Sequence, residues 1–484
     1  MYIYIETIAT MISGYVFWLV MSKITTPVMI GTSSTVVSLG AISASIATIG
    51  VPIGAQRFLG KSFSEQKLSD TKVFVKASLL LVSIGIFICG ISIFIAYNWV
   101  NSTFKLDFSL IVVTIILQGS SVIMTLLRSI VIASLKIKAL PTIMILSSVA
   151  RIILGIILVL FGAGALGISV SFSFHPVIAS ILLAVAIVMI FKSMPSDKTQ
   201  LIFKKSFRNI LVASGASWIP VVVHTIGYYL GPLLVFGVIS AGQAGLYFIA
   251  YSVFTALSAL MAVLFNISYP VLSAMQDGRK RFAWRAMKLS FIISIPLSSS
   301  LIFYSKQVMN LFGQDYVEAS YSLEILLLSM FPMAFMTGVN TLANAYGNYK
   351  QVLITGLASN IPSALFYFIL VPIFKDSSGA AISFTAGSII GFIVSIVIAR
   401  KIEMLIFWKD LAFIFAIPTG IALFLSYLHI NYLMGIVITL AMTYLLLSIL
   451  HILTRIDICD LFSVIPPSIV NPLLKVWYMF YRNK

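Results

Sequence analysis

The feature that most constrains this chain is a series of apolar runs, each about 20 residues long, which recur along the whole sequence. Each run is long enough for a helix to cross a hydrocarbon core about 30 Å thick. A helix satisfies its own backbone polar groups inside such a core. Only 9% of the 484 residues are charged and 60% are hydrophobic, so the chain could not build an ordinary water-exposed surface. The sequence therefore predicts an all-α polytopic membrane protein.

The apolar runs predict about fourteen membrane-spanning helices. They are expected near residues 4–21, 33–56, 77–97, 108–134, 141–161, 166–191, 210–235, 242–270, 289–305, 321–345, 351–374, 379–399, 408–428 and 432–452.

Lysine and arginine are distributed unevenly among the connections between these spans. Every second connection is basic, and these connections together with the C-terminal segment hold 25 of the 31 Lys and Arg residues. The intervening connections hold only Lys23, Lys105, Lys306 and Lys375. Since cytoplasmic loops collect basic residues, we expect a cell-membrane protein with both termini in the cytoplasm. Topology then explains the net charge of +17, and no nucleic-acid partner is expected.

A faint internal repeat relates the two parts of the chain. A shift of 212 residues places Lys138 on Lys350 and aligns the first six spans with the next six. The same shift aligns Gly167, Ser171 and Phe172 with Gly379, Ser383 and Phe384. Because six is an even number of helices, both copies keep the same orientation and are related by a pseudo-two-fold axis along the membrane normal. The repeat predicts two six-helix lobes, with two extra C-terminal helices outside the duplication.

These patterns divide the chain into five expected parts. They are an N-lobe at 1–192, a cytoplasmic linker at 193–208, a C-lobe at 209–400, the two extra helices at 401–453, and a cytoplasmic tail at 454–484. The tail mixes aromatic and basic residues, which is typical of a segment lying on an anionic membrane surface.

Two arginines lie deep inside predicted helices, apart from the basic connections. Arg128 and Arg151 flank the short basic turn 136–141. At 1.5 Å per residue, they lie roughly 15 to 20 Å into the membrane. Inserting such a cation costs about 3 kcal/mol, so it usually has a partner or a task. Arg128 could instead extend toward the cytoplasmic interface, and Glu6 is a candidate counter-ion or coupling group that could equally be interfacial.

Polar residues accompany both arginines at helical spacing. On the first helix these are Thr114, Gln118, Ser121, Thr125 and Arg128, and on the second they are Ser148 and Arg151. Residues three or four apart share one face of a helix, and a polar face avoids lipid. Gln118, Thr125 and Ser148 are therefore candidate cavity-lining residues.

The second copy of the repeat is polar where the first is cationic. Arg128 aligns with Asn340 and Arg151 with Ser363, while Asn344 and Asn360 lie nearby in the sequence. Asn340, Asn344 and Asn360 are candidates for binding sugar hydroxyls. The alternative is structural, because buried asparagines in membrane helices often hydrogen-bond to neighbouring helices.

The sequence contains no pattern for a cofactor, a metal or a catalytic nucleophile. It has no GxxxxGK[ST], no zinc-ligand spacing and no GxSxG. A GxGxxG at Gly162–Gly167 follows no predicted strand, so dinucleotide binding is not expected. We expect that the chain is not an enzyme and does not hydrolyse ATP.

Four short stretches resemble a known family. They are VPIGAQRFLGKSFSEQK from Val51, LFGQDY from Leu311, ANAYGNYK from Ala343 and SSGAAIS from Ser377. They are similar to stretches of oligosaccharide and polysaccharide flippases in the multidrug/oligosaccharidyl-lipid/polysaccharide (MOP) superfamily. The resemblance implies two lobes that open alternately to each side of the membrane, and cavity arginines that bind a lipid phosphate. Arg128, Arg151 and Arg57 are the positions that could do so here.

The expected function is movement of a polyprenyl-(di)phosphate-linked oligosaccharide from the cytoplasmic to the outer leaflet. The expected partners are this substrate, membrane lipids and glycan-assembly enzymes, with the flippase itself a monomer. The main alternative is a multidrug or metabolite cation antiporter, which would need an acidic residue in the middle of the membrane. Glu6 and Glu324 lie near helix ends, which argues against it. A third alternative, a scaffold without transport activity, predicts dispensable arginines.

Overall fold

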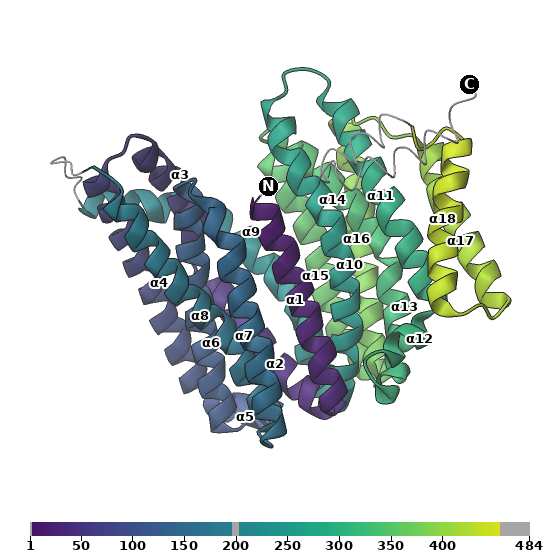
Figure 1. Cartoon of the computed structure of the whole chain (residues 1–484), viewed down its shortest axis with the longest axis horizontal. Coiled ribbons are helices and arrows are strands. Elements are labelled where there is room, and N and C mark those ends of the chain that lie inside the picture. The colour runs from purple at the N-terminus through teal and green to yellow at the C-terminus, as the bar shows by residue number, and fades with distance from the viewer. Residues whose placement is uncertain (1, 196–202, 455–484) are drawn as a thin grey trace. The chain divides into compact units, whose positions relative to one another are not determined.

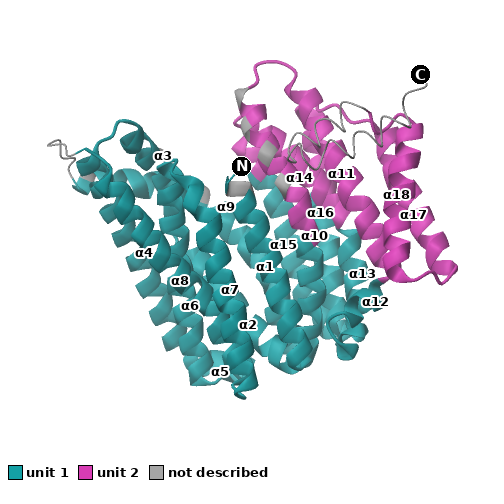
Figure 2. Cartoon of the chain, in the orientation of Figure 1, with its two compact units in different colours: residues 1–256, 305–329, 353–391 teal, residues 257–304, 330–352, 392–484 magenta. Residues whose placement is uncertain are grey.

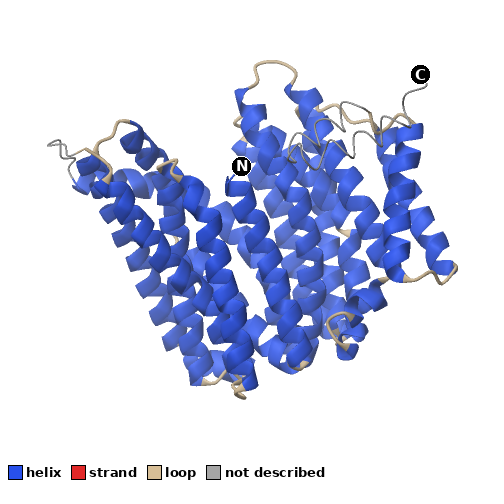
Figure 3. Cartoon of the chain, viewed as in Figure 1, coloured by secondary structure: helices blue, strands red, loops and turns tan. Residues whose placement is uncertain are grey.

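The structure is a computed structural model that describes residues 2–195 and 203–454 (Figure 1). Within these ranges the side chains of a few helical residues are not described: Ile3, Tyr4, Arg57, Lys205, Ala216, Ser217, Val263, Ile267, Pro270 and Ala274. The described residues form helices joined by short loops and turns, without strands (Figure 3). Part of the predicted linker and nearly all of the predicted tail lie outside the described residues.

Fourteen helical segments of the described chain are long and apolar enough to cross a membrane, which confirms the predicted class and the approximate number of spans. Thirteen of them contain one long helix each. These helices are α1 (Tyr2–Ile24), α2 (Pro27–Ala47), α4 (Leu68–Ile95), α6 (Phe108–Ala133), α7 (Leu140–Leu160), α8 (Gly164–Lys192), α9 (Phe203–Val238), α10 (Ala241–Ala274), α11 (Arg279–Phe303), α15 (Tyr349–Phe374), α16 (Ser377–Lys401), α17 (Trp408–Tyr427) and α18 (Tyr432–Ile449).

The fourteenth segment, Gln314–Ala345, is a composite. It consists of η2 (Gln314–Ala319), α13 (Ser320–Leu328) and α14 (Met330–Ala345). Four further short elements complete the described chain. They are α3 (Val51–Ser64), α5 (Tyr97–Phe104), η1 (Ile137–Ala139) and α12 (Ser305–Asn310).

Two predicted boundaries are wrong for identifiable reasons. The span predicted at 33–56 is two helices, because Ile49 and Gly50 have φ of 50° and 69° and end the α-helical course. Helix α11 begins at Arg279 rather than near residue 289. Cations in this part of α11 have partners elsewhere in the chain: Arg279 and Lys288 donate to carbonyls, and Lys280 pairs with Glu403 at 2.8 Å.

The chain divides into two compact units, each built from separate segments of the sequence (Figure 2). Unit 1 contains residues 1–256, 305–329 and 353–391, and unit 2 contains 257–304, 330–352 and the segment from 392. These units do not follow the predicted lobe boundaries. The two six-helix lobes and the 212-residue repeat therefore stay predictions.

In unit 1, two helix backbones meet directly at glycines. A Cβ atom built on Gly31 of α2 would overlap the carbonyl of Ala241 at the start of α10. A Cβ built on Gly245 of α10 would overlap the carbonyl of Pro27. Both glycines allow a backbone approach that any larger residue would prevent.

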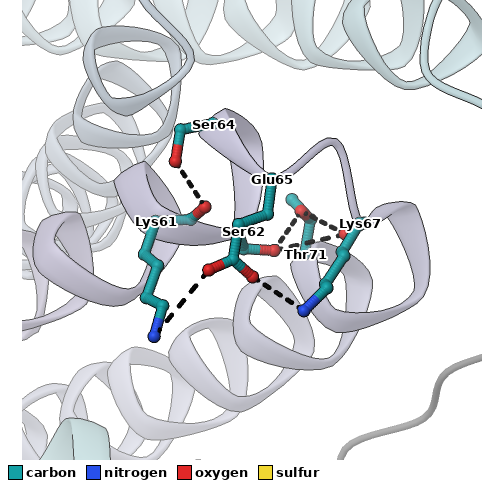
Figure 4. Close-up of polar contacts among 6 residues, drawn as sticks. All are labelled: Lys61, Ser62, Ser64, Glu65, Lys67 and Thr71. Carbon is teal, nitrogen blue, oxygen red and sulfur yellow. Dashed lines mark hydrogen bonds and ion pairs between the residues drawn. The ribbon is translucent and has the colours of Figure 1, made fainter.

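An exposed turn between α3 and α4 of unit 1 is held by a small ionic network (Figure 4). The carboxylate of Glu65 accepts from Lys67 Nζ at 2.7 Å and lies 3.8 Å from Lys61 Nζ. The hydroxyls of Ser62 and Thr71 hydrogen-bond at 2.5 Å beneath it. The hydrogen bond from Lys67 is the main reason that the pKa of Glu65 lies below its ordinary value.

In unit 2, two basic residues of α11 donate to carbonyls at or just beyond the ends of neighbouring helices. Lys288 is 7% exposed, and its Nζ donates to the carbonyl of Ile452, just beyond α18, at 3.0 Å. Arg279 Nη1 donates to the carbonyl of Ala345, the last residue of α14, at 3.2 Å. Carbonyls at helix C-termini lack partners within the helix, so Arg279 stabilises the end of α14, while Lys288 satisfies a carbonyl in the turn that follows α18.

Candidate functional site

A cavity of about 330 Å³ lies inside unit 1, among α2, α3, α6, α8 and α9. Its described lining residues are Val37, Ala41, Ala44, Ser45, Thr48, Gly50, Pro52, Ile53, Leu117, Ser121, Thr125, Phe172, Val221 and Tyr229. The lining is thus mainly apolar, with five hydroxyl side chains, including that of Tyr229, and two aromatic residues. A pocket of this size and composition is typical of small-molecule sites.

The break between α2 and α3 shapes one side of this cavity. The left-handed conformation at Gly50 turns the chain, and Cβ atoms built on Gly50 or Gly54 would overlap Ser214 of α9. Trp218 of α9 donates through Nε1 to the carbonyl of Ile46 in the last turn of α2, at 3.1 Å. The glycine pair therefore packs α3 against α9, and Pro52 starts α3 where its missing N–H has no cost.

The predicted polar face of α6 divides into two parts. Ser121 and Thr125 line the cavity. Thr114 and Gln118 are buried, and Gln118 Nε2 lies 3.4 Å from the carbonyl of Ile86 in α4. The structure therefore brings Thr125 to the cavity but places Gln118 in the packing between α6 and α4.

Arg128 continues the face of α6 and is paired with Glu6 of α1. Arg128 Nε donates to Glu6 Oε1 at 2.9 Å, and Nη2 donates to Oε2 at 2.7 Å. The carboxylate side chain is 5% exposed and the arginine side chain 32%. Two parallel hydrogen bonds between ions are the strongest arrangement for this pair. Arg128 is therefore neutralised by a buried acid from a distant part of the sequence.

Arg151 on α7 is in a different environment. The residue is 5% exposed, and its Cζ lies 4.8 Å from the ring centroid of Phe17 in α1 and 5.1 Å from that of Phe172 in α8. Among the described residues, Nε and Nη2 have no hydrogen-bond partner and no carboxylate pairs with the guanidinium. Ring faces attract a cation but do not accept strong hydrogen bonds. The charge is thus buried with incomplete compensation.

The aromatic rings around Arg151 form a continuous cluster, the Arg151 cluster, of Phe17, Trp18, Phe172 and Phe248. Phe172 lies 5.7 Å from Phe17 and 5.5 Å from Trp18 between ring centroids. Trp18 in turn contacts Phe248 of α10 at 4.6 Å. Because Phe172 also lines the cavity, its ring connects the cavity to the buried guanidinium.

The other predicted site residues whose side chains are described do not line the cavity. Ser148 accepts a hydrogen bond from Ser13 Oγ at 2.9 Å, which joins α7 to α1. Asn360 Nδ2 donates to the carbonyl of Gly356 in its own helix, and its side chain packs against Gly227 of α9. Asn340 and Asn344 are half-buried on α14 of unit 2, and the side chain of Arg57 lies outside the described residues.

The sequence analysis did not single out Phe17 or Phe172 for the site. An aromatic residue in an apolar helix is normally part of the core, so composition gives no signal. One signal was available, because Phe172 lies four residues before Pro176 in the same helix. A proline inside a helix leaves the carbonyl four residues earlier without its usual donor.

The sequence of this chain matches a known protein family. The family described as "Polysaccharide biosynthesis protein" matches residues 20–321, which is more than half of the chain. The chain belongs to the polysaccharide biosynthesis protein family. This confirms the resemblance seen in the sequence. A search of curated proteins found no match.

The chain also has the fold of solved membrane-protein structures, one of which is described as a member of the MOP superfamily. The lipid II flippase MurJ, in an inward closed conformation, matches with a TM-score of 0.70 and 17% identity over 92% of this chain and 98% of that chain. An inward-facing multidrug resistance MATE family transporter matches with a TM-score of 0.63 and 15% identity over 83% of this chain and 96% of that chain. The protein is therefore an all-helical, multi-pass membrane protein with a transporter fold.

Proposed function

We propose that this protein moves a polyprenyl-(di)phosphate-linked oligosaccharide from the cytoplasmic to the outer leaflet of the cell membrane by alternating access. The proposal assigns both termini to the cytoplasm, so the turn between α6 and α7 lies on the side where the substrate enters. The observation that carries it is the buried guanidinium of Arg151, which has two nitrogens without hydrogen-bond partners among the described residues.

An anionic phosphate group would supply what Arg151 lacks. Guanidinium stays charged when buried and binds phosphate oxygens through paired N–H donors. Such charge-assisted hydrogen bonds are roughly twice as strong as neutral ones. We assign the main phosphate contact to Arg151, with the sugar in the cavity beside it and the lipid tail in the bilayer.

Arg128 has a secondary role in this proposal. Its pair with Glu6 is one-third exposed on the arginine side, so a phosphate can compete with the carboxylate for the same two donors. The role proposed for Glu6 is to neutralise Arg128 while the site is empty. Arg57, which lies on α3, remains a proposed third contact.

In this proposal, transport of the headgroup does not require ATP hydrolysis. Moving about two negative charges outward across 100 mV, inside negative, is worth roughly 4 to 5 kcal/mol. The membrane potential can therefore favour outward movement of an anionic headgroup without a coupling ion.

A cation antiporter is the second candidate, favoured by the structural match to the MATE family transporter. That function needs an acidic group available to exchange a cation for the substrate. Glu6 is the buried acid of the described site, and it is already bound to Arg128. Glu324 accepts a hydrogen bond from Ser305 in unit 1 and is not among the residues that line the cavity. The charge arrangement therefore supports an anionic substrate.

The test is transport of a polyprenyl-diphosphate-linked oligosaccharide by purified protein in vesicles with an imposed potential. Arg151→Ala should reduce the initial rate by at least about tenfold, because a charge-assisted contact is worth about 1.5 to 3 kcal/mol. Arg128→Ala should reduce it less. Lys105→Ala, which removes a cation outside the spans, is the matched control.

Wild-type rates for both arginine variants would rule out the phosphate site. Efflux of an organic cation by the same vesicles, abolished by Glu6→Gln, would establish the antiporter instead.

A further inference from the structure

Helix α8 has a built-in weakness at the residue that contacts Arg151. Pro176 lies inside this helix and has no backbone N–H. The missing donor would have bonded to the carbonyl of Phe172, four residues earlier, and the proline ring also crowds that carbonyl. The backbone at Phe172 is therefore less constrained than in an uninterrupted helix.

Phe172 contacts Arg151 and also belongs to the lining of the cavity. The centroid of its ring lies 5.1 Å from Arg151 Cζ. Among the described residues of the lining, Phe172 is the one with a ring contact to the guanidinium, so it links the cavity to Arg151. Phe17 covers Arg151 from α1 and does not line the cavity.

Within the described part of the chain, Arg151, covered by the ring of Phe172, lacks hydrogen-bond acceptors for part of its guanidinium group. Its Nε and Nη2 donors are buried without partners among the described residues, and a buried donor without an acceptor is costly. Phosphate oxygens in the position of the ring would accept from these donors. Arg151 therefore interacts more favourably with an anion in the cavity than with the ring of Phe172.

We propose that Phe172 is a gate residue which covers Arg151 in the empty protein and moves aside, through the weakened backbone before Pro176, when a diphosphate group enters the cavity. This inference rests on the proposed function, since it concerns how the substrate headgroup reaches its site. Phe172 is a positioning residue in this mechanism, because it controls access to the group that binds.

The gate can be tested by the rate at which anions bind to the full-length protein in lipid nanodiscs. Trp18 lies 5.5 Å from Phe172 between ring centroids, so its fluorescence should report movement of that ring. The probes are inorganic pyrophosphate and geranyl diphosphate, followed by stopped-flow fluorescence. Trp18→Phe should remove the signal and identifies its source.

Three substitutions separate the gate from the phosphate site. Phe172→Leu keeps apolar bulk but loses the ring face, and it should speed association of both probes by about tenfold. Because the Trp18 signal depends on the Phe172 ring, association to this variant and to the wild type is compared with radiolabelled probes in a rapid-filtration assay. Pro176→Ala restores the N–H donor to the Phe172 carbonyl and should slow association several-fold. Phe174→Ala changes a 38% exposed ring on the same helix and should leave the rate unchanged.

Arg151→Gln distinguishes the two proposals. Loss of probe binding in Arg151→Gln, with wild-type rates in Phe172→Leu and Pro176→Ala, would refute the gate and leave the phosphate site standing. Unchanged binding in Arg151→Gln would overturn both. Tighter binding of geranyl diphosphate than of pyrophosphate supports a lipid-linked headgroup, whereas the opposite order would overturn that assignment in favour of a free anion.

Discussion

At the scale of single residues, the pair of Glu6 and Arg128 should be a measurable contributor to stability. The acid is buried and the arginine is 32% exposed, so the interaction lies between a surface and a buried ion pair. We expect a coupling energy of about 1 to 3 kcal/mol, discounted from fully buried pairs for solvent screening. Glu6→Gln, Arg128→Gln and the double variant give this value as a double-mutant cycle in SDS unfolding. Strictly additive effects would show that the pair is not formed.

The turn between α3 and α4 gives a prediction about pH. The pKa of Glu65 is lowered chiefly by the hydrogen bond from Lys67, so the ionised form is favoured in the folded protein. The stabilisation from this pair is present above the ordinary glutamate pKa and is lost as the pH falls through the lowered folded value. Titration of ¹³C-labelled Glu65 by NMR should show a low midpoint.

Two lysine variants provide the internal comparison for that titration. Lys67→Met should raise the Glu65 midpoint more than Lys61→Met does, because Lys67 Nζ is at 2.7 Å and Lys61 Nζ at 3.8 Å. Equal shifts in the two variants would contradict this geometry.

Individual site residues could be predicted from the sequence only where a charged residue lies within an apolar helix. Arg128 and Arg151 are cations within apolar runs, so insertion energy alone identified them. The partner of Arg128 lies 122 residues away; the sequence analysis named Glu6 as a candidate counter-ion, but no local spacing linked it to Arg128. The aromatic residues of the site were not predicted, because phenylalanine is common in any apolar helix and its presence gives no signal of a site.

At the scale of elements, the junction between α2 and α3 depends on glycine at one position. Gly50 has φ of 69°, and an added Cβ would also overlap Ser214 of α9. Gly50→Ala should therefore destabilise the protein by more than about 1 kcal/mol through strain and steric overlap together. The loss of stability would be measured by SDS unfolding, and the effect on the cavity by binding of geranyl diphosphate.

A matched control lies on the same short helix. Gly60 of α3 has open space around its Cβ position and helical φ, so Gly60→Ala should be neutral or stabilising by about 0.5 to 1 kcal/mol. Equal destabilisation by both substitutions would contradict the special role of the junction, because Gly60→Ala should only raise helix propensity.

Element boundaries were harder to predict than elements. Apolar periodicity extends through the 33–56 region without interruption, so the sequence analysis joined α2 to α3. The break at Gly50 depends on packing against α9, which lies far along the chain. The early start of α11 was missed because its cations contact carbonyls that only the tertiary fold brings near.

At the scale of the whole molecule, the distribution of basic residues predicts which ends of the helices face the cytoplasm. Ser102 on α5 lies in a connection predicted to be outside, and Leu135 lies beside the predicted cytoplasmic turn between α6 and α7. In a Cys89→Ser, Cys459→Ser background, a membrane-impermeant maleimide added to intact cells should label Ser102→Cys and spare Leu135→Cys. The reverse pattern would invert the topology and the proposed direction of transport.

The number of spans and the fold class were predictable because hydropathy acts over whole segments and needs no knowledge of contacts. The division into compact units was not, since it depends on which helices pack together. The described segments of unit 1 and unit 2 alternate along the sequence. A repeat detected by sequence spacing carries no information about such packing.

The contact between α2 and α10 restricts what evolution can change. A methyl group at Gly31 or Gly245 would push one backbone off the other, and no rotamer change could relieve the overlap because the obstacle is a main-chain carbonyl. Family members that conserve this helix crossing should therefore have glycine in both alignment columns. A relative that has lost either glycine should position its second and tenth helices farther apart, whatever substrate it carries.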